Sequence, residues 1–180
     1  MLNKKNTFFD FIDSTNSLLS KDIGNPAKVF AFGGSAGGLL MGAIINYEPE
    51  LYKGIISAVP VVDVLTTMSD ESIPLTTFEY KEWGNPKNKE EYEYIKSYSP
   101  YDNIEKKNYP TVFVTSSLFD SQVQYFEPAK YVPKLRENST SKNPNLLKMN
   151  LIGGHSGKSG RLNALEESAQ DNAFFLKLID

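Results

Sequence analysis

The chain has 180 residues, of which 40% are hydrophobic and 23% charged, with a formal net charge of −3. This length and composition are typical of one globular domain with its own hydrophobic core. The absence of cysteine excludes disulfides and thiol catalysis. The single histidine, His155, excludes a multi-histidine metal site within one chain. The net negative charge, without a stripe of basic residues, argues against nucleic acid as the main partner.

No apolar run approaches the roughly 18 residues that a membrane span needs. The first 20 residues contain two lysines but no unbroken apolar stretch, so they read as an amphipathic helix and not as a signal peptide. We therefore expect a cytoplasmic protein with no membrane partner and no cofactor.

Helical and extended patterns alternate along the chain. Apolar residues at helical spacing predict a first helix over residues 7–19, and short apolar or β-branched runs predict four strands. The predicted strands are 28–32, 54–59, 111–117 and 146–152, and the later helices are 36–46, 89–96, 126–137 and 161–179. Pro133 is expected to kink or shorten its helix, and residues 60–110 are expected to be irregular apart from 89–96. This alternation predicts an α/β fold whose mostly parallel sheet has helices on both faces.

A glycine-rich serine motif lies between the first predicted strand and the next helix. Gly33-Gly34-Ser35-Ala36-Gly37 matches G-x-S-x-G, the pattern of a nucleophile elbow. In such an elbow the serine occupies a tight, strained turn, and its neighbours are small so that strand and helix can approach each other. The backbone N–H of Ala36 would then lie at a helix N-terminus, where it can donate to an oxyanion.

The glycine-rich segments have three other possible interpretations, of which two are excluded by their residue spacing. The same segment could be a turn that only packs a helix on a strand, with a structural Ser35. A dinucleotide-binding loop is excluded because G-x-G-x-x-G from Gly33 needs glycine at Ser35. GGHSGKSG misses the phosphate-binding pattern because the required first glycine is Ile152.

A serine nucleophile needs a base and an orienting acid, and two residues stand in suitable places. Asp120 follows the third predicted strand and His155 follows the fourth, in the order Ser, acid, His that α/β hydrolases use. Asp120 could alternatively be a turn or N-cap residue, and a lone histidine is often structural. The order of all three residues at successive strand ends favours a catalytic triad of Ser35, Asp120 and His155.

Several longer blocks carry a more specific resemblance. FGGSAGGLLMGA, EWGNP, SYSPYDNI, DSQVQYFEPAKYV and GGHSGKSGR together resemble the C-terminal part of the catalytic domain in the oligopeptidase B branch of the prolyl oligopeptidase family. The resemblance runs from about residue 6 to the end of the chain and implies an α/β-hydrolase fold. It also implies a serine endopeptidase that hydrolyses short peptides after Arg or Lys.

The resemblance assigns further residues to substrate binding. Glu79 matches one of two acidic residues that bind the basic side chain, and the second matching position is Lys81, with Glu82 beside it. Gln122 stands where some relatives have an arginine that holds the substrate backbone. We expect Glu79 and Gln122 to bind substrate, with short basic peptides as partners.

The family implies more than these residues contain. Its members carry a β-propeller, earlier sheet strands and a tyrosine that supplies a second oxyanion donor. Residues 1–180 are therefore expected to be the C-terminal portion of a peptidase catalytic domain, and a separate chain is a candidate source of the missing part. The alternatives are an esterase or acylaminoacyl peptidase, or a non-catalytic remnant or interaction module.

Overall fold

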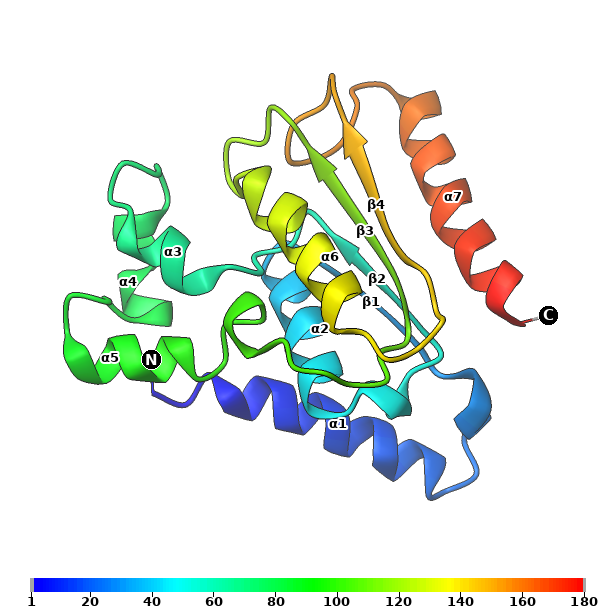
Figure 1. Ribbon diagram of the computed structural model, residues 1–180. Helices are drawn as coiled ribbons and strands as arrows, with labels where there is room; N and C mark the ends of the chain where they lie inside the picture. Colours follow the sequence, from blue (N-terminus) through cyan, green and yellow to red (C-terminus); the bar gives the residue numbers. More distant parts are fainter. Residues whose placement is uncertain (1, 180) are drawn as a thin grey trace.

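A four-stranded parallel sheet forms the centre of the molecule (Figure 1). The computed structural model describes residues 2–179. The strands are β1 (Phe30–Gly34), β2 (Gly54–Ala58), β3 (Thr111–Ser117) and β4 (Asn145–Asn150), in the spatial order β1-β2-β3-β4. The α-helices are α1 (Lys5–Leu19), α2 (Ala36–Tyr47), α3 (Val64–Ser69), α4 (Thr76–Trp83), α5 (Lys89–Lys96), α6 (Phe126–Asn138) and α7 (Arg161–Ile179). The predicted α/β fold with a parallel sheet is confirmed.

The parallel register determines where the loops meet. Gly34 pairs with Ala58, Ala58 with Thr115, and Thr115 with Lys148, so the carboxyl ends of the strands share one edge of the sheet. The residues that follow β1, β3 and β4 therefore emerge at that edge. These are the segments that contain Ser35, Asp120 and His155.

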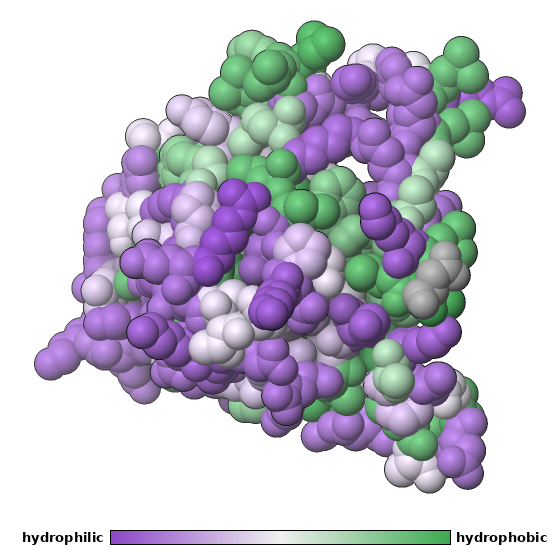
Figure 2. Space-filling view, turned by 45° about the vertical axis from the view of Figure 1, so that its right-hand side comes forward, coloured by the Kyte–Doolittle hydropathy of each residue, from purple (hydrophilic) through white to green (hydrophobic). Residues whose placement is uncertain are grey.

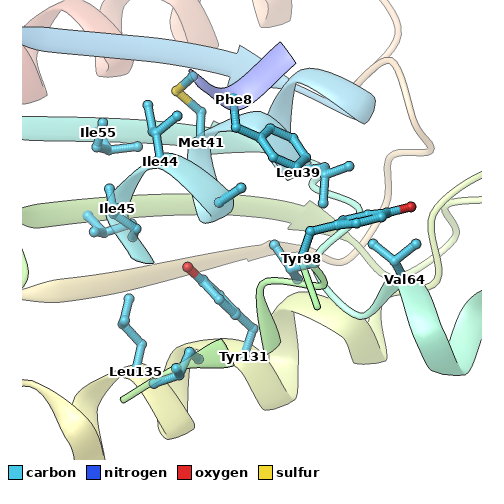
Figure 3. Close-up of a cluster of buried hydrophobic side chains, with 14 of the residues drawn as sticks. Phe8, Leu39, Met41, Ile44, Ile45, Ile55, Val64, Tyr98, Tyr131 and Leu135 are labelled. Atoms are coloured by element: carbon cyan, nitrogen blue, oxygen red, sulfur yellow. The ribbon is translucent and has the colours of Figure 1, made fainter. Parts of the chain in front are cut away.

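The hydrophobic core lies between the sheet and helices α1, α2 and α6. Figure 3 shows Phe8 from α1, Leu39 and Ile44 from α2, and Leu135 from α6 around the inner face of the sheet; all four side chains have 0% exposure. Burying one such side chain contributes about 1.5–3 kcal/mol. The central helix α2 is apolar almost all round because it packs on β1, β2 and α1.

The opposite face of the sheet is less completely covered. Helix α7 crosses it and makes aromatic contacts, Phe175 with Phe30 and Phe174 with Phe113, but none of its own residues is buried. Phe32 on the edge strand β1 remains 54% exposed. Figure 2 shows hydrophobic surface among hydrophilic side chains on the side where α7 lies. Helices do lie on both faces, but the second face is only partly covered.

Most predicted elements are confirmed, with shifts at their ends. The first strand begins at Phe30, because Pro26 starts a short 3-10 helix that continues through Lys28. Helix α6 continues through Pro133 to Asn138. The proline therefore does not shorten the helix.

Residues 60–110 are more ordered than predicted. They contain α3 and α4 in addition to α5. The interpretation of this segment as irregular was wrong because α3 is only six residues long and α4 has no apolar stripe; Phe78, at its centre, is 81% exposed. Figure 1 shows these helices projecting beside the sheet, at the end where β1 leads into α2.

Candidate active site

Ser35 occupies the strained turn that the glycine motif predicts. Its φ and ψ are 55° and −117°, a positive-φ conformation that costs a non-glycine residue about 1–3 kcal/mol. The surrounding backbone holds this conformation. Ser35 N–H donates to Ala58 O at 2.8 Å, and Ser35 O accepts from Gly38 N–H at 2.9 Å and from Val61 N–H at 3.2 Å.

The glycines around Ser35 have different roles. A Cβ on Gly33 would collide with the backbone of Gly37 and lie 2.9 Å from Met41 Cγ, and one on Gly38 would lie 2.6 Å from Pro60 Cα. A Cβ on Gly37 would meet nothing within 4 Å. The turn therefore requires glycine at 33 and 38, whereas position 37 has room for a side chain.

Asp120 and His155 are joined by a hydrogen bond. Asp120 Oδ2 lies 2.8 Å from His155 Nδ1, and Asp120 Oδ1 accepts the N–H groups of Gln122 at 2.8 Å and Val123 at 2.9 Å. The Asp120 side chain is fully buried and that of His155 is 15% exposed. Because a carboxylate only accepts, Nδ1 carries the proton and Nε2 is left as the free, basic nitrogen.

Ser35 belongs to the same edge of the sheet but faces a different cavity. The hydrogen bonds found within residues 2–179 do not include one between Ser35 Oγ and His155. His155 lines a cavity of about 270 Å³ beneath α7, while Ser35 lines a second cavity of about 200 Å³ on the side of α3 and α4. The structure thus joins Asp120 to His155 and leaves Ser35 on the adjoining turn.

The second cavity has an apolar wall with carboxylates. We call it the serine pocket; it is lined by Ser35, Ala36, Val61, Thr67, Met68, Ile73, Leu75, Thr76, Glu79, Glu82, Trp83, Gln122 and Val123. Both predicted substrate-binding residues, Glu79 and Gln122, are among them, as is Ala36, which begins α2. Ala36 is the first residue of α2. Its N–H group therefore has no carbonyl acceptor within the helix.

The acidic side chains of the pocket come from α4. Glu79 is partly buried and accepts a hydrogen bond from Trp83 Nε1–H. Glu82 also lines the pocket and pairs with Lys4 Nζ at 2.8 Å, whereas Lys81 is exposed and is not part of the lining. The carboxylate beside Glu79 is therefore Glu82, one residue after the position that the family resemblance identified.

Other lining residues escaped the sequence analysis. Thr67 and Met68 lie on α3, which was not predicted, and Trp83 ends α4. The motif EWGNP was a usable signal for Trp83, because the only tryptophan of the chain directly follows Glu82. Thr67 offers no such signal, since its place in the pocket depends on how α3 packs.

Residues 2–179 show neither a membrane-spanning helix nor a metal site. None of its helices combines the length and apolar character needed to cross a membrane. Residues 2–179 also contain no group of three or more His, Asp or Glu side chains arranged to hold a metal ion.

Comparisons with known proteins agree with this geometry. The sequence profile described as the prolyl oligopeptidase family matches residues 1–180. The chain is 53% identical over 176 residues to "Protease 2" of Moraxella lacunata and 55% identical to "Dipeptidyl aminopeptidase BI" of Pseudoxanthomonas mexicana; 98% of this chain is covered in both cases. These matches cover 26% and 24% of the relatives, so the chain spans about a quarter of their length.

Solved structures of two oligopeptidases B superpose closely on this chain. Oligopeptidase B from Leishmania major superposes with a TM-score of 0.97 at 46% identity, covering 99% of this chain and 25% of the other. Oligopeptidase B from Trypanosoma brucei, with covalently bound antipain, gives 0.96 at 47% identity, covering 98% of this chain and 25% of the other. The chain belongs to the prolyl oligopeptidase family.

Proposed function

We propose that this chain carries the nucleophile, base and acid of a serine endopeptidase that hydrolyses short peptides after Arg or Lys. The observation that carries the proposal is Ser35 itself, held at positive φ on the wall of a pocket that also contains Glu79. The Asp120–His155 hydrogen bond and the relatives named as proteases support it.

In the proposed reaction Ser35 Oγ attacks the carbonyl carbon of the scissile peptide bond. His155 Nε2 takes the hydroxyl proton and later returns it to the leaving amine, so that the C–N bond breaks and an acyl-enzyme forms. Asp120 keeps the Nδ1–H tautomer in place and stabilises the imidazolium. Water then attacks the acyl-enzyme with His155 again as the base, and the peptide acid leaves.

Two groups are proposed to bind the charged atoms. Ala36 N–H, at the start of α2, donates to the oxyanion that develops on the carbonyl oxygen. Glu79, partly buried beside Trp83, pairs with the basic P1 side chain. Gln122 lines the same pocket and is placed to hydrogen-bond the substrate backbone.

The relatives are longer than this chain, so the fully active site is proposed to need more polypeptide than residues 1–180. The partly covered sheet face and the exposed Phe32 on β1 support the proposal that further polypeptide, in the same or a separate chain, covers that face. The family resemblance implies that this polypeptide also supplies a second oxyanion donor. Loss of one such donor costs about 10²–10³ in kcat. We therefore expect weaker turnover from residues 1–180 alone than from a full-length relative.

The test is labelling with a fluorophosphonate probe followed by a substrate panel. Wild type should label, and Ser35→Ala should not. Glu79→Gln should still label but lose about 10- to 100-fold of the preference for arginyl over alanyl amides, since a charged hydrogen bond is worth about 1.5–3 kcal/mol. Glu93→Gln, which changes an exposed carboxylate on α5, is the matched control.

The panel also separates the rival activities. Blocked arginyl amides test the endopeptidase, unblocked dipeptidyl amides test the activity named for the Pseudoxanthomonas relative, and acetylated-residue amides and esters test the remaining alternatives. Equal turnover of arginyl and alanyl amides by a labelled enzyme would contradict the basic specificity. A folded wild type that does not label would show that these residues alone do not assemble the site.

A further inference from the structure

A buried carboxylate that the proposed reaction does not use lies behind the serine pocket. Glu127, in the first turn of α6, has 0% exposure. Its Oε2 accepts Asp63 N–H at 2.8 Å and its Oε1 accepts the hydroxyl of Thr67 at 2.6 Å. Both partners belong to α3 or the residue before it, so this one side chain ties α6 to α3.

The charged groups around Glu127 form a small cluster of two buried carboxylates and one partly exposed amine. The carboxylate of Asp63 is also buried and pairs with Lys130 Nζ, which comes from the next turn of α6 and lies 4.9 Å from the ring centroid of Tyr101. Burial raises the pKa of Glu127 to about 7, and the Asp63 carboxylate acts in the same direction. Glu127 therefore changes charge near neutral pH.

Hydrogen bonds connect this cluster to the residue proposed to bind the substrate cation. Thr67 lines the serine pocket, and its carbonyl accepts the hydroxyl of Thr76 at 2.9 Å. Thr76 begins α4, which carries Glu79 one turn later. Glu127 lies in the first turn of α6, and this turn directly follows the loop whose Gln122 and Val123 N–H groups bind Asp120. Glu127 thus links the acid's loop to the pocket wall.

We propose that Glu127 is a positioning residue that holds α3 and α4, and hence Glu79, in place for a cationic ligand, and that it does so best as a carboxylate. This inference rests on the proposed function. As a carboxylate, both oxygens of Glu127 accept, and their hydrogen bonds are charge-assisted. On protonation one oxygen becomes a donor, so the hydroxyl of Thr67 must reverse its hydrogen bond and a negative charge behind the cation pocket is lost.

The only tryptophan of the chain reports on this pocket directly. Trp83 lines the serine pocket and donates to Glu79, so its fluorescence can follow the binding of benzamidine, an aromatic cation. Titrations would be made with wild type, Glu127→Gln, and Glu137→Gln as control, an exposed carboxylate on the same helix. Circular dichroism would check that each variant is folded.

The expected result is a pH-dependent difference. At about pH 8.5 Glu127→Gln should bind benzamidine about two- to tenfold more weakly than wild type, as for one impaired hydrogen bond, and at about pH 5.5 the two should match. The other groups of the pocket are the same in the two proteins, so the difference between them isolates Glu127. Glu137→Gln should follow wild type at both pH values.

A second variant approaches the same contact from α3. Thr67→Val removes the donor to Glu127 Oε1 and should weaken benzamidine binding in the same direction, with less than additive loss when combined with Glu127→Gln. Equal affinities of folded wild type and Glu127→Gln at both pH values would overturn the proposal. Fluorophosphonate labelling of Ser35 is measured in parallel, so that a wild type that binds benzamidine without labelling fails the proposed function and not this inference.

Discussion

Asp120 Oδ2 lies 2.8 Å from His155 Nδ1, and the other oxygen of the same carboxylate accepts two backbone N–H groups, from Gln122 and Val123. The carboxylate is therefore fixed on both sides before it meets the imidazole. This explains how a loop at the edge of the sheet can hold a histidine ring in one orientation, and why the acid tolerates full burial: three donors surround its two oxygens.

Replacing Asp120 by Asn should impair the base without unfolding the chain. The amide can donate to Nδ1 and so favours the wrong imidazole tautomer, and a loss of about 10³–10⁴-fold in the rate of fluorophosphonate labelling is expected. Labelling reactions stopped at a series of times and quantified by in-gel fluorescence give the labelling rate. Asp102→Asn, an exposed aspartate, should label like wild type; a normal rate in Asp120→Asn would contradict the role of the acid.

Replacing Ser35 by glycine should stabilise the fold while removing the proposed nucleophile. Glycine adopts positive φ without strain, so we expect a gain of about 1 kcal/mol, or about 2–4 °C in melting temperature, over Ser35→Ala. Thermal denaturation followed by circular dichroism measures this difference. Equal melting temperatures for the two variants would show that the turn stores no strain.

The two outer glycines of the serine motif should respond in opposite ways to alanine. Gly33→Ala forces a Cβ against Gly37 and Met41 and should cost about 1–3 kcal/mol or more of stability, as overpacking does. Gly37→Ala has open space and lies in the first turn of α2, so it should be neutral or stabilising. Urea denaturation of the two single variants makes the comparison, and similar losses in both would contradict it.

The contrast between Gly33 and Gly37 shows what the sequence could and could not predict. The strand, turn and helix around Ser35 follow from glycine and apolar patterns that act locally, and β3, α5 and α7 were predicted to the residue for the same reason. The order Ser35, Asp120, His155 placed the three residues at one edge because parallel strands bring their carboxyl ends together. Nothing in G-x-S-x-G distinguishes the glycine that lacks space from the one that has it.

The serine pocket depends on packing that no local pattern encodes. Helix α4 presents the polar face of Glu79 and Glu82 to a cavity whose other wall comes from α3 and from the loop after Asp120. Because α3 is only six residues long and α4 has no apolar stripe, the sequence predicted irregular chain for both, and the family resemblance alone drew attention to Glu79. The buried contact between Glu127 and Thr67 joins residues 60 positions apart, and only the fold brings them together.

Lys4 should weaken the binding of cations to the serine pocket. Its Nζ lies 2.8 Å from Glu82 Oε1 and 4.6 Å from the ring centroid of Trp83, so it occupies a carboxylate that lines the pocket. Lys4→Met should raise the affinity for benzamidine about two- to fivefold at low salt, since ion pairs of this exposure are worth about 0.2–1 kcal/mol, and salt should shrink the gain. Lys5→Met is the adjacent control; an unchanged affinity in Lys4→Met would mean that Glu82 does not face the ligand.

The pKa of Glu127 makes a prediction for stability with a definite sign. Burial raises this pKa from 4.5 to about 7, so folding favours the protonated form, and the stability that this contributes is present at low pH and lost as pH rises through about 7. The loss approaches about 3 kcal/mol at alkaline pH, at about 1.4 kcal/mol per pKa unit. Glu127→Gln, which cannot ionise, should match wild type near pH 5 and exceed it in unfolding free energy near pH 8. Urea denaturation at both pH values, with Glu137→Gln as control, measures the difference.

If Glu127→Gln were instead less stable than wild type at pH 8, the carboxylate's hydrogen bonds to Asp63 and Thr67 would outweigh the cost of burying its charge.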